Sequence, residues 1–346
     1  MLLLNAAHET CAISCVRNAM SDLLFTLNAV LPIVLLVAIG YVLKRMKLIT
    51  LAGAKEMNRL VFRVFLPVTL FLNVYNIENV GEIKLGYILY VCVIVLLVFF
   101  ASILAFGLMF GDKKRIGALV QASFRSNYAL IGIPLATAIF GTEGGIYATL
   151  LSAFTIPLYN ILAVIVLSIF AGERAERVNV RKIVLGILKN PLIIGIALGC
   201  VALAVRALFV NTGVDFRLTE ITPVYKILGQ LSAVSTPLAL VALGANFEFS
   251  AVPGMKREII AGTLAKCVIT PIIGLCAALV LGCFENAHFA VFVSVFGTSV
   301  AVSSVPMAQE MDSDYELAGQ LVVWTTVMSA FSLFVFIYIL RVMGIF

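Results

Sequence analysis

The chain has 346 residues, of which 62% are hydrophobic and only 12% are charged, and its net charge is +6. Soluble domains contain roughly 25% charged residues, so this composition excludes a water-soluble globular protein. A membrane-spanning helix needs about 20 residues, so a chain of this length has room for roughly ten of them and for no separate soluble domain. The sequence therefore predicts an all-α polytopic membrane protein that works within the lipid bilayer.

Residues 1–23 differ from the rest of the chain. A short leucine-rich start, too brief to cross a membrane, is followed by polar residues that include His8 and Arg17. A signal peptide has the reverse order, with basic residues before its apolar run. We interpret this segment as an N-terminal tail, and our hypothesis is that translation in the cell starts at Met20.

Ten apolar runs, bounded by charged or turn residues, predict ten transmembrane helices. They cover residues 24–43, 52–75, 87–110, 117–140, 146–171, 190–209, 222–245, 258–283, 287–309 and 317–343. A basic linker at 172–189 separates a first repeat of five helices, 24–171, from a second, 190–343. Since five is an odd number, the second repeat crosses the membrane upside down, which gives a 5+5 inverted repeat.

The spacing of prolines and glycines supports the duplication. Pro32 and Gly40 are eight residues apart in the first predicted helix, and Pro191 and Gly199 are eight apart in the sixth. Lysine and arginine gather in alternate loops, and basic loops stay on the cytoplasmic side. This distribution predicts that both termini lie outside and that the linker at 172–189 lies in the cytoplasm. The short architecture favours a bacterial inner membrane.

A motif occurs twice, 172 residues apart, each time within a predicted helix. In each copy a small polar pair lies two and three residues after a phenylalanine, and a proline lies ten residues after it. The copies are Phe124-Arg125-Ser126-Asn127 with Pro134, and Phe296-Gly297-Thr298-Ser299 with Pro306. Proline frees carbonyl groups that hydrocarbon cannot solvate, so a broken helix persists only beside protein or a polar cavity. Paired breaks at matching positions of two halves predict a transporter site.

The expected substrate-binding residues therefore lie at the two breaks. They are Arg125, Ser126, Asn127, Gly132, Thr298, Ser299, Ser303 and Ser304. Each hydroxyl alone could equally bond within or between helices without a ligand. The matching placement of the two pairs before a proline favours the binding role. Asn73 and Asn160 are weaker candidates for the site, and we favour a role for them in joining helices.

Buried charge suggests the class of substrate. None of the 18 carboxylates lies deep in a predicted helix, whereas Arg125 lies near the middle of the fourth. A cation at the bilayer centre costs about 2.5 to 3.5 kcal/mol on insertion scales, so it usually faces a cavity or a partner. The missing partner is then the ligand, which predicts an anionic substrate. The alternative for Arg125 is bonding to carbonyls freed by Pro134 or Pro306.

Four further cations lie within predicted helices. Arg59 and Lys226 are near helix ends, where long side chains reach water. Arg63 and Lys266 could either bond to backbone carbonyls or line a vestibule. The sequence favours neither reading for these two residues.

No motif for catalysis or nucleotide binding is present. The sequence has no G-x-x-x-x-G-K-[ST] for phosphates and no H-E-x-x-H for zinc. Its seven cysteines show no metal-ligand spacing, and the odd number argues against a full set of disulfides. We therefore expect no enzyme activity, no cofactor and no metal. Nucleotides and nucleic acids are not expected partners.

Several motifs together resemble the auxin efflux carrier family, which includes plant PIN carriers and bacterial malate or malonate permeases. They are Leu27-Asn28 with Pro32 and Gly40-Tyr41, Leu66-Pro67, Ser126-Asn127 with Gly132-Ile133-Pro134, and the counterpart Pro306. The resemblance covers nearly the whole chain from about residue 24. It implies a fold similar to that of bile-acid/sodium symporters, in which the broken fourth and ninth helices cross. It also implies a homodimer and an elevator-like movement of one helix bundle.

Residues and resemblance together predict a secondary active carrier of a small organic anion, most simply a mono- or dicarboxylate. The substrate carboxylate would face the half-helix termini and Arg125. One alternative is a sodium- or proton-coupled symporter of the bile-acid symporter type. Another is an anion channel or a receptor. Malate, malonate and auxin-like anions are equally compatible with the sequence.

Overall fold

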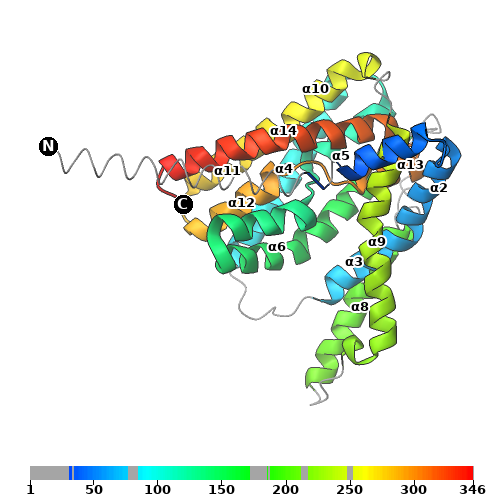
Figure 1. Ribbon diagram of the computed structural model, residues 1–346. Coiled ribbons are helices and arrows are strands. Elements are labelled where there is room, and N and C mark those ends of the chain that lie inside the picture. The colour runs from blue at the N-terminus through cyan, green and yellow to red at the C-terminus, as the bar shows by residue number, and fades with distance from the viewer. Residues whose placement is uncertain are drawn as a thin grey trace, which may run out of the picture.

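The computed structural model describes residues 31–32, 35–76, 85–171, 185, 188–211, 217–247 and 252–345 (Figure 1). This part of the chain is helical and contains no strand, which confirms the predicted all-α class. Its one β-type contact is an isolated antiparallel bridge between Ser126 and Val300. The expected tail, 1–23, and most of the expected linker, 172–189, lie outside the described residues.

Within this part, seven helices are long and apolar enough to cross a membrane. They are Leu51–Tyr75, Leu85–Met109, Tyr128–Ile169, Pro191–Phe209, Thr222–Asn246, Pro253–Leu281 and Tyr315–Val342. The chain is therefore an integral membrane protein, but the expected ten-helix 5+5 repeat is not confirmed by this count. One cause is that the first expected helix, 24–43, begins outside the described residues. The other causes are two broken helices and one fused pair.

The expected fourth and ninth helices are interrupted in the middle. The run at 117–140 divides into α5, Lys113–Phe124, and a second half that begins with the π-helical turn Tyr128–Gly132. The run at 287–309 divides into α12, Asn286–Gly297, and α13, Ser304–Glu310. Because α5, α12 and α13 are each shorter than the roughly 20 residues of a span, none of them is among the seven.

Two expected helices are fused in α6, Ile133–Ile169. With the turn before it, this segment is 42 residues long, about twice the length that a span requires. The backbone leaves helical geometry at Phe140 and Gly141, and Gly141 has φ +63°, a conformation that favours glycine. A Cβ on Gly145 would lie 2.6 Å from Oγ1 of Thr137, so the arms on either side of the bend lie close together. The segment is therefore a helical hairpin.

Figure 1 shows α2 (Leu51–Leu60), α3 (Leu66–Tyr75), α8 (Pro191–Asn211) and α9 (Thr222–Asn246) as one group of neighbouring helices, and this group packs through glycine. Residues 35–45 belong to the same group. A Cβ on Gly195 would lie 2.5 Å from the Pro67 carbonyl oxygen, and one on Gly40 would collide with the Val241 carbonyl. Small residues let membrane helices approach backbone to backbone. We call this group the scaffold.

The remaining helices form a second group, which we call the bundle (Figure 1). It consists of α4 (Leu85–Met109), α5, α6, α10 (Lys256–Leu264), α11 (Thr270–Leu281), α12, α13 and α14 (Tyr315–Val342). Helix α12 lies at its centre, since every residue from Ala287 to Gly297 is buried. Tyr90 of α4 packs against it, with its ring 4.9 Å from that of Phe292. The break that follows α12 is therefore held away from lipid.

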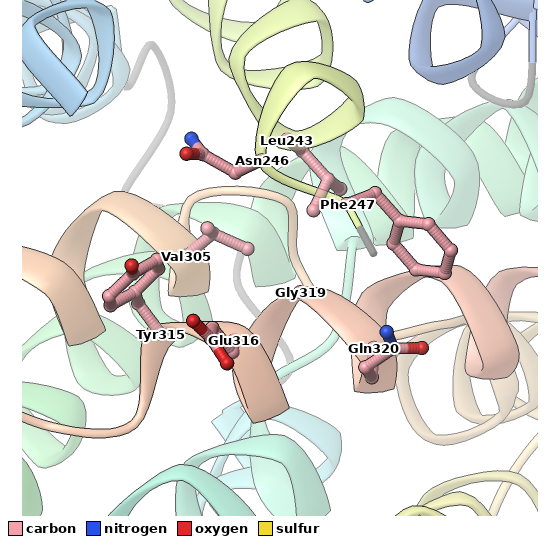
Figure 2. A pocket seen from close by; sticks show the side chains of 8 residues that line it. All are labelled: Leu243, Asn246, Phe247, Val305, Tyr315, Glu316, Gly319 and Gln320. Atoms are coloured by element: carbon pink, nitrogen blue, oxygen red, sulfur yellow. The ribbon is translucent and has the colours of Figure 1, made fainter. Parts of the chain in front are cut away.

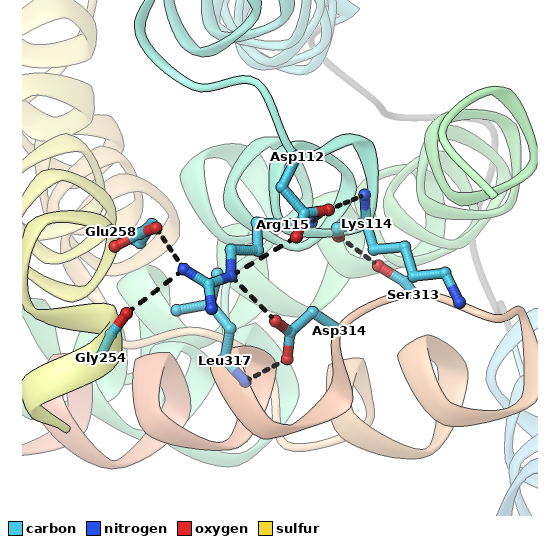
Figure 3. Close-up of polar contacts among 8 residues, drawn as sticks. All are labelled: Asp112, Lys114, Arg115, Gly254, Glu258, Ser313, Asp314 and Leu317. Atoms are coloured by element: carbon cyan, nitrogen blue, oxygen red, sulfur yellow. Dashed lines mark hydrogen bonds and ion pairs between the residues drawn. The ribbon is translucent and has the colours of Figure 1, made fainter. Parts of the chain in front are cut away.

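An ionic cluster at the start of α5 ties the bundle together (Figure 3). The Arg115 guanidinium lies 2.6 Å from Glu258 of α10 and 3.4 Å from Asp314, the N-cap of α14. It also donates a hydrogen bond to the Gly254 carbonyl at 3.3 Å. Asp112 caps α5 by accepting from the backbone of Lys114 and Arg115. The first turns of three helices are thus joined at one end of the molecule, which we call the basic end.

Scaffold and bundle meet where the end of α9 lies against the start of α14 (Figure 2). Leu243 and Phe247 of this region face Gly319 and Gln320. A Cβ on Gly319 would lie 2.9 Å from Cδ1 of Leu243, so the contact is tight. The hollow between the helices measures about 10 Å³, no more than the space for a single water. This junction is a packing contact and too small for a ligand.

Candidate functional site

The two breaks lie beside each other and are paired through their backbones. The Asn127 N–H donates to the Ser299 carbonyl at 2.7 Å, and the Ala301 N–H donates to the Arg125 carbonyl at 3.4 Å. These bonds flank the antiparallel bridge between Ser126 and Val300. The backbone N–H and C=O groups of the two unwound segments therefore form hydrogen bonds with each other, which hydrocarbon could not provide. We call this place the crossover.

The prolines of the repeated motif lie beyond the breaks. The backbone is extended at Arg125 and at Thr298, before either proline is reached. Pro134 is in the first turn of α6, and Pro306 is in the first turn of α13. The π-helical turn Tyr128–Gly132 leads into α6 without a gap, so Pro134 lies six residues after the helix restarts. Pro306 lies in a first turn after a break, where the missing N–H of proline has no helical partner. Both prolines thus lie after the restart of a helix and not at the point at which the chain leaves helical geometry.

A cavity of about 100 Å³ lies at the crossover. Four of the expected site residues line it, namely Arg125, Ser126, Asn127 and Ser303. The scaffold forms the opposite wall with α3 and α9, from residues that include Thr69, Asn73, Ser235 and Thr236. Pockets for drug-sized ligands measure roughly 300 to 1,000 Å³, so this cavity matches a ligand of few atoms. It lies between the two groups of helices.

Arg125 is the cation of this cavity and is only 3% exposed. Its guanidinium donates to Oδ1 of Asn160 and to Oγ of Ser303, both at 2.7 Å, and it contacts the Met307 sulfur. Asn160 is held by its own bond to the Ile156 carbonyl at 2.7 Å. No carboxylate pairs with Arg125 in the described part of the chain. The hydrogen-bond partners of this buried positive charge are therefore neutral, so the charge can still pair with an anion.

Lys266 is the second buried cation, with no exposed surface. It belongs to the π-helical turn Ala265–Ile269 between α10 and α11. Its ammonium donates to Oγ of Ser126 at 2.5 Å, and that hydroxyl in turn donates to the Val295 carbonyl at 2.5 Å. Lys266 does not line the cavity, so it contacts the crossover from the other side.

The other expected site residues are buried around the crossover without lining its cavity. Oγ1 of Thr298 donates to the Ser294 carbonyl at 2.9 Å, as expected for a hydroxyl that closes a helix end. A Cβ on Gly132 would collide with the Tyr128 ring, so this glycine permits a close approach. The hydroxyls of Ser299 and Ser304 have no hydrogen-bond partner among the described residues.

Asn127 both lines the cavity and has a side-chain donor without a hydrogen-bond partner among the described residues, as a binding group would. This donor is its amide nitrogen. A buried polar donor without a partner costs about 1 to 3 kcal/mol, so it gains from a ligand that can accept. Asn73 and Asn160 also line the cavity, although the sequence predicts that they join helices. Only the folding of distant segments brings these two amides to Arg125.

A larger vestibule of about 680 Å³ adjoins the cavity through Asn73, which lines both. The vestibule lies between the end of α3 and the hairpin of α6. Its polar lining consists of Asn73, Asn76, Thr137, Thr142, Thr149 and Ser152, and none of the described residues that line it is charged. It is directed away from the basic end, because α3 and the first arm of α6 both run away from that end. A neutral hollow with hydrogen-bonding side chains thus lies next to the crossover cavity.

A polar contact joins scaffold and bundle on the other side, at the basic end. Glu310 of α13 lies 3.6 Å from Arg59 and 3.1 Å from Arg63. Beside it, Asn58 donates to the Gln309 side chain at 3.0 Å. Arg59 is more than half exposed, as expected for a side chain that reaches water. Arg63 is also more than half exposed, and it pairs with Glu310 instead of lining the vestibule. The Glu310 side chain is only 9% exposed. We call these five residues the latch.

Long apolar helices, paired breaks and a buried, cation-lined cavity between two groups of helices define a membrane transporter. The family model described as Membrane transport protein matches residues 25–337. The chain belongs to this family, which confirms the resemblance to the auxin efflux carriers. Transport families are usually not enzymes, and no feature of the described residues indicates catalysis.

Two relatives are also named as transporters. An uncharacterized transporter of Methanothermobacter thermautotrophicus is 25% identical over 312 residues, which cover 88% of this chain and 95% of the relative. An uncharacterized transporter of Methanocaldococcus jannaschii is 28% identical over 232 residues, covering 64% of this chain and 69% of the relative. The similarity thus extends over both halves of the chain.

Proposed function

We propose that the protein is a secondary carrier of a small organic anion, a mono- or dicarboxylate, that binds in the cavity at the crossover. The observation that carries this proposal is Arg125, buried in a small cavity with only neutral partners. A carboxylate can accept two hydrogen bonds from one guanidinium, a geometry that a lysine cannot offer. The free amide nitrogen of Asn127 supplies a further donor.

Binding would exchange hydrogen bonds within the cavity. Arg125 now donates to Asn160 and Ser303, and a carboxylate would replace one of these neutral acceptors with a charged one. Bonds to a charged group contribute about 1.5 to 3 kcal/mol each, more than neutral ones. The partners of Arg125 therefore hold its side chain in position until the substrate enters. A neutral substrate of the same size would gain much less.

We also propose alternating access by an elevator-type movement of the bundle against the scaffold. The vestibule and the latch support it, because the vestibule lies next to the cavity on one side and the latch joins scaffold and bundle by polar contacts on the other. If the basic end faces the cytoplasm, as its lysines and arginines favour, the described state is open to the outside and both termini lie there.

The ten-helix inverted repeat is part of this proposal. Backbone contacts support it, since Gly40 packs on Val241 as Gly199 packs on Phe71, with a Cβ of the latter glycine 2.9 Å from the Phe71 carbonyl oxygen. These pairs join the first expected helix to the seventh and the sixth to the second. They are the same contact seen twice, as a two-fold axis in the membrane plane would produce.

A homodimer completes the proposed assembly. Helix α8 of the scaffold is the least buried of the seven spans, and α9 is the next. Their outward faces are apolar, with Leu198, Val201 and Ile227 exposed. A second copy that packs there would fix the scaffold while the bundle moves. Crosslinking of a cysteine at Val201 in native membranes tests this contact.

The experiment that tests the substrate site compares Arg125→Ala with the wild type. Purified protein is screened by thermal unfolding against a panel of carboxylates, and liposomes are used for counterflow of any carboxylate that stabilises it. We expect one class of carboxylate to raise the unfolding midpoint of the wild type and to exchange across the membrane. Arg125→Ala should lose both effects. Arg257→Ala removes an exposed arginine as the matched control and should retain both.

The proposal is wrong if Arg125→Ala folds and still exchanges the carboxylate at the wild-type rate. Conduction that does not saturate would instead indicate a channel. Stabilisation without exchange would indicate a receptor.

A further inference from the structure

Lys266 places a positive charge at the carboxyl ends of two half-helices. Helix α5 ends at Phe124 and α12 ends at Gly297, and both ends lie at the crossover. The ammonium reaches them through one hydroxyl, Oγ of Ser126, which follows α5 and donates to the Val295 carbonyl of α12. One turn further along, Oγ1 of Thr270 donates to the Ser123 carbonyl at 3.0 Å. The segment that carries Lys266 therefore runs beside the end of α5.

The surroundings of this ammonium are neutral oxygen atoms. Its hydrogen-bond partner is the Ser126 hydroxyl, and the next acceptor in that chain of hydrogen bonds is the Val295 carbonyl. No carboxylate pairs with Lys266 in the described part of the chain, and no carboxylate is buried there. The carboxyl ends of α5 and α12 lie at the same crossover, and the partial negative charge of a helix carboxyl end favours a cation nearby. Hydroxyl and carbonyl oxygens are also the ligands of a hard monovalent cation such as Na⁺.

Carriers with interrupted helices commonly hold their coupling cation at such a place. Half-helix carboxyl ends and unwound carbonyls bind Na⁺ there, and the substrate anion binds nearby. Here a cation of the same charge is already present on a side chain. We infer that Lys266 is a tethered substitute for a coupling sodium ion, and that its removal uncovers a monovalent-cation site formed by Ser126 and the half-helix carbonyls.

Transport by the wild-type carrier would then need no Na⁺, a consequence that rests on the proposed function. The positive charge at the crossover belongs to the Lys266 side chain, which is part of the protein. The carrier would therefore not transport a separate cation together with the substrate. A sodium-coupled symporter, one of the alternatives open from the sequence, is then disfavoured for this chain.

Sodium-dependent stability tests the inference without a substrate. Thermal unfolding of the purified protein is measured in NaCl and in choline chloride at equal ionic strength. The wild type should unfold at the same temperature in both salts. Lys266→Ala should unfold earlier in choline and be stabilised by Na⁺ in a saturable manner, with a rise of a few degrees. Lys226→Ala removes an exposed lysine as the matched control and should behave like the wild type.

A second variant covers the case in which Lys266→Ala does not fold. Lys266→Gln keeps a donor for Ser126 without the charge, and its amide oxygen can join a sodium site, so it should also gain stability from Na⁺. Saturable stabilisation of the wild type by Na⁺ would overturn the inference. Equal behaviour of a folded Lys266→Ala or Lys266→Gln in the two salts would overturn it as well.

Carboxylate counterflow in the two salts separates this inference from the proposed function. If the wild type exchanges no carboxylate in either salt, the proposed function fails, while the unfolding comparison still decides the role of Lys266. If exchange by the wild type requires Na⁺, the proposed function stands and the role assigned to Lys266 is wrong.

Discussion

The latch offers a direct test of how the carrier changes state. Glu310 holds Arg59 and Arg63 at 3.6 and 3.1 Å across the junction between bundle and scaffold. Glu310→Gln removes the negative charge and retains the size of the side chain. Because the bundle must part from the scaffold at the basic end to open the cavity to that end, the variant should favour the state that is open at the basic end.

The size of this shift between the two states can be estimated from how exposed the side chains of the two ion pairs are. Ion pairs with an exposed partner contribute about 0.2 to 1 kcal/mol each, and both arginines are more than half exposed. The low exposure of the Glu310 side chain, 9%, places the sum of two pairs near 1 kcal/mol rather than at the lower limit. A change of about 1 kcal/mol corresponds to a roughly fivefold change in population. The hydrogen bond between Asn58 and Gln309 remains in the variant.

Cysteine accessibility measures the population. In a cysteine-free background, Ser235→Cys places a thiol in the wall of the crossover cavity. A membrane-impermeant thiol reagent is added from the basic side of oriented vesicles, and its labelling rate is compared with and without the Glu310→Gln substitution. We expect labelling to be about fivefold faster with Glu310→Gln. Asp312→Asn removes an exposed carboxylate at the same end as the control, because its ion pair with Lys114 lies within the bundle. An unchanged rate in Glu310→Gln would refute the role assigned to the latch.

Two further variants test the packing of each group of helices. Gly195→Leu should prevent folding of the scaffold, because a Cβ alone would lie 2.5 Å from the Pro67 carbonyl oxygen. Gly229→Leu should be tolerated, because nothing lies within 4 Å of a Cβ at that position. The yield of detergent-solubilised protein and its gel-filtration profile measure the effect of both substitutions. Arg115→Ala should lower the unfolding midpoint by several degrees, since it leaves the part-buried Glu258 without its partner at 2.6 Å, and equal midpoints for wild type and variant would contradict this.

Local patterns were sufficient to predict the all-helical class and the two breaks. The repeated motif marks each break because a phenylalanine, a polar pair and a later proline occupy fixed positions in the chain. The position of the break within each helix was less predictable, since Pro134 and Pro306 lie six and two residues after the points at which the helices restart, at Tyr128 and Ser304. The helix count differed because interrupted halves are too short to be recognised as spans.

Contacts between distant segments could not be predicted from the sequence. Lys266 meets Ser126 across 140 positions, and Arg63 meets Glu310 across 247. Periodicity and composition describe neighbours along a helix, whereas these pairs depend on how separate helices pack. The same reason explains why the sequence did not place Asn73 and Asn160 in the wall of the cavity beside Arg125. Asn160 also joins two segments, as expected, because it accepts a hydrogen bond from Arg125.

The backbone pairing at the crossover has a consequence for how such proteins diversify. The bonds from Asn127 to Ser299 and from Ala301 to Arg125 use only main-chain atoms, so they hold whichever side chains stand there. Selection could then alter the side chains that meet the substrate while the architecture is inherited unchanged. Proline alone would be barred from positions 127 and 301, because it has no N–H to donate. A relative with this fold and a proline at either position would show that the rule does not hold.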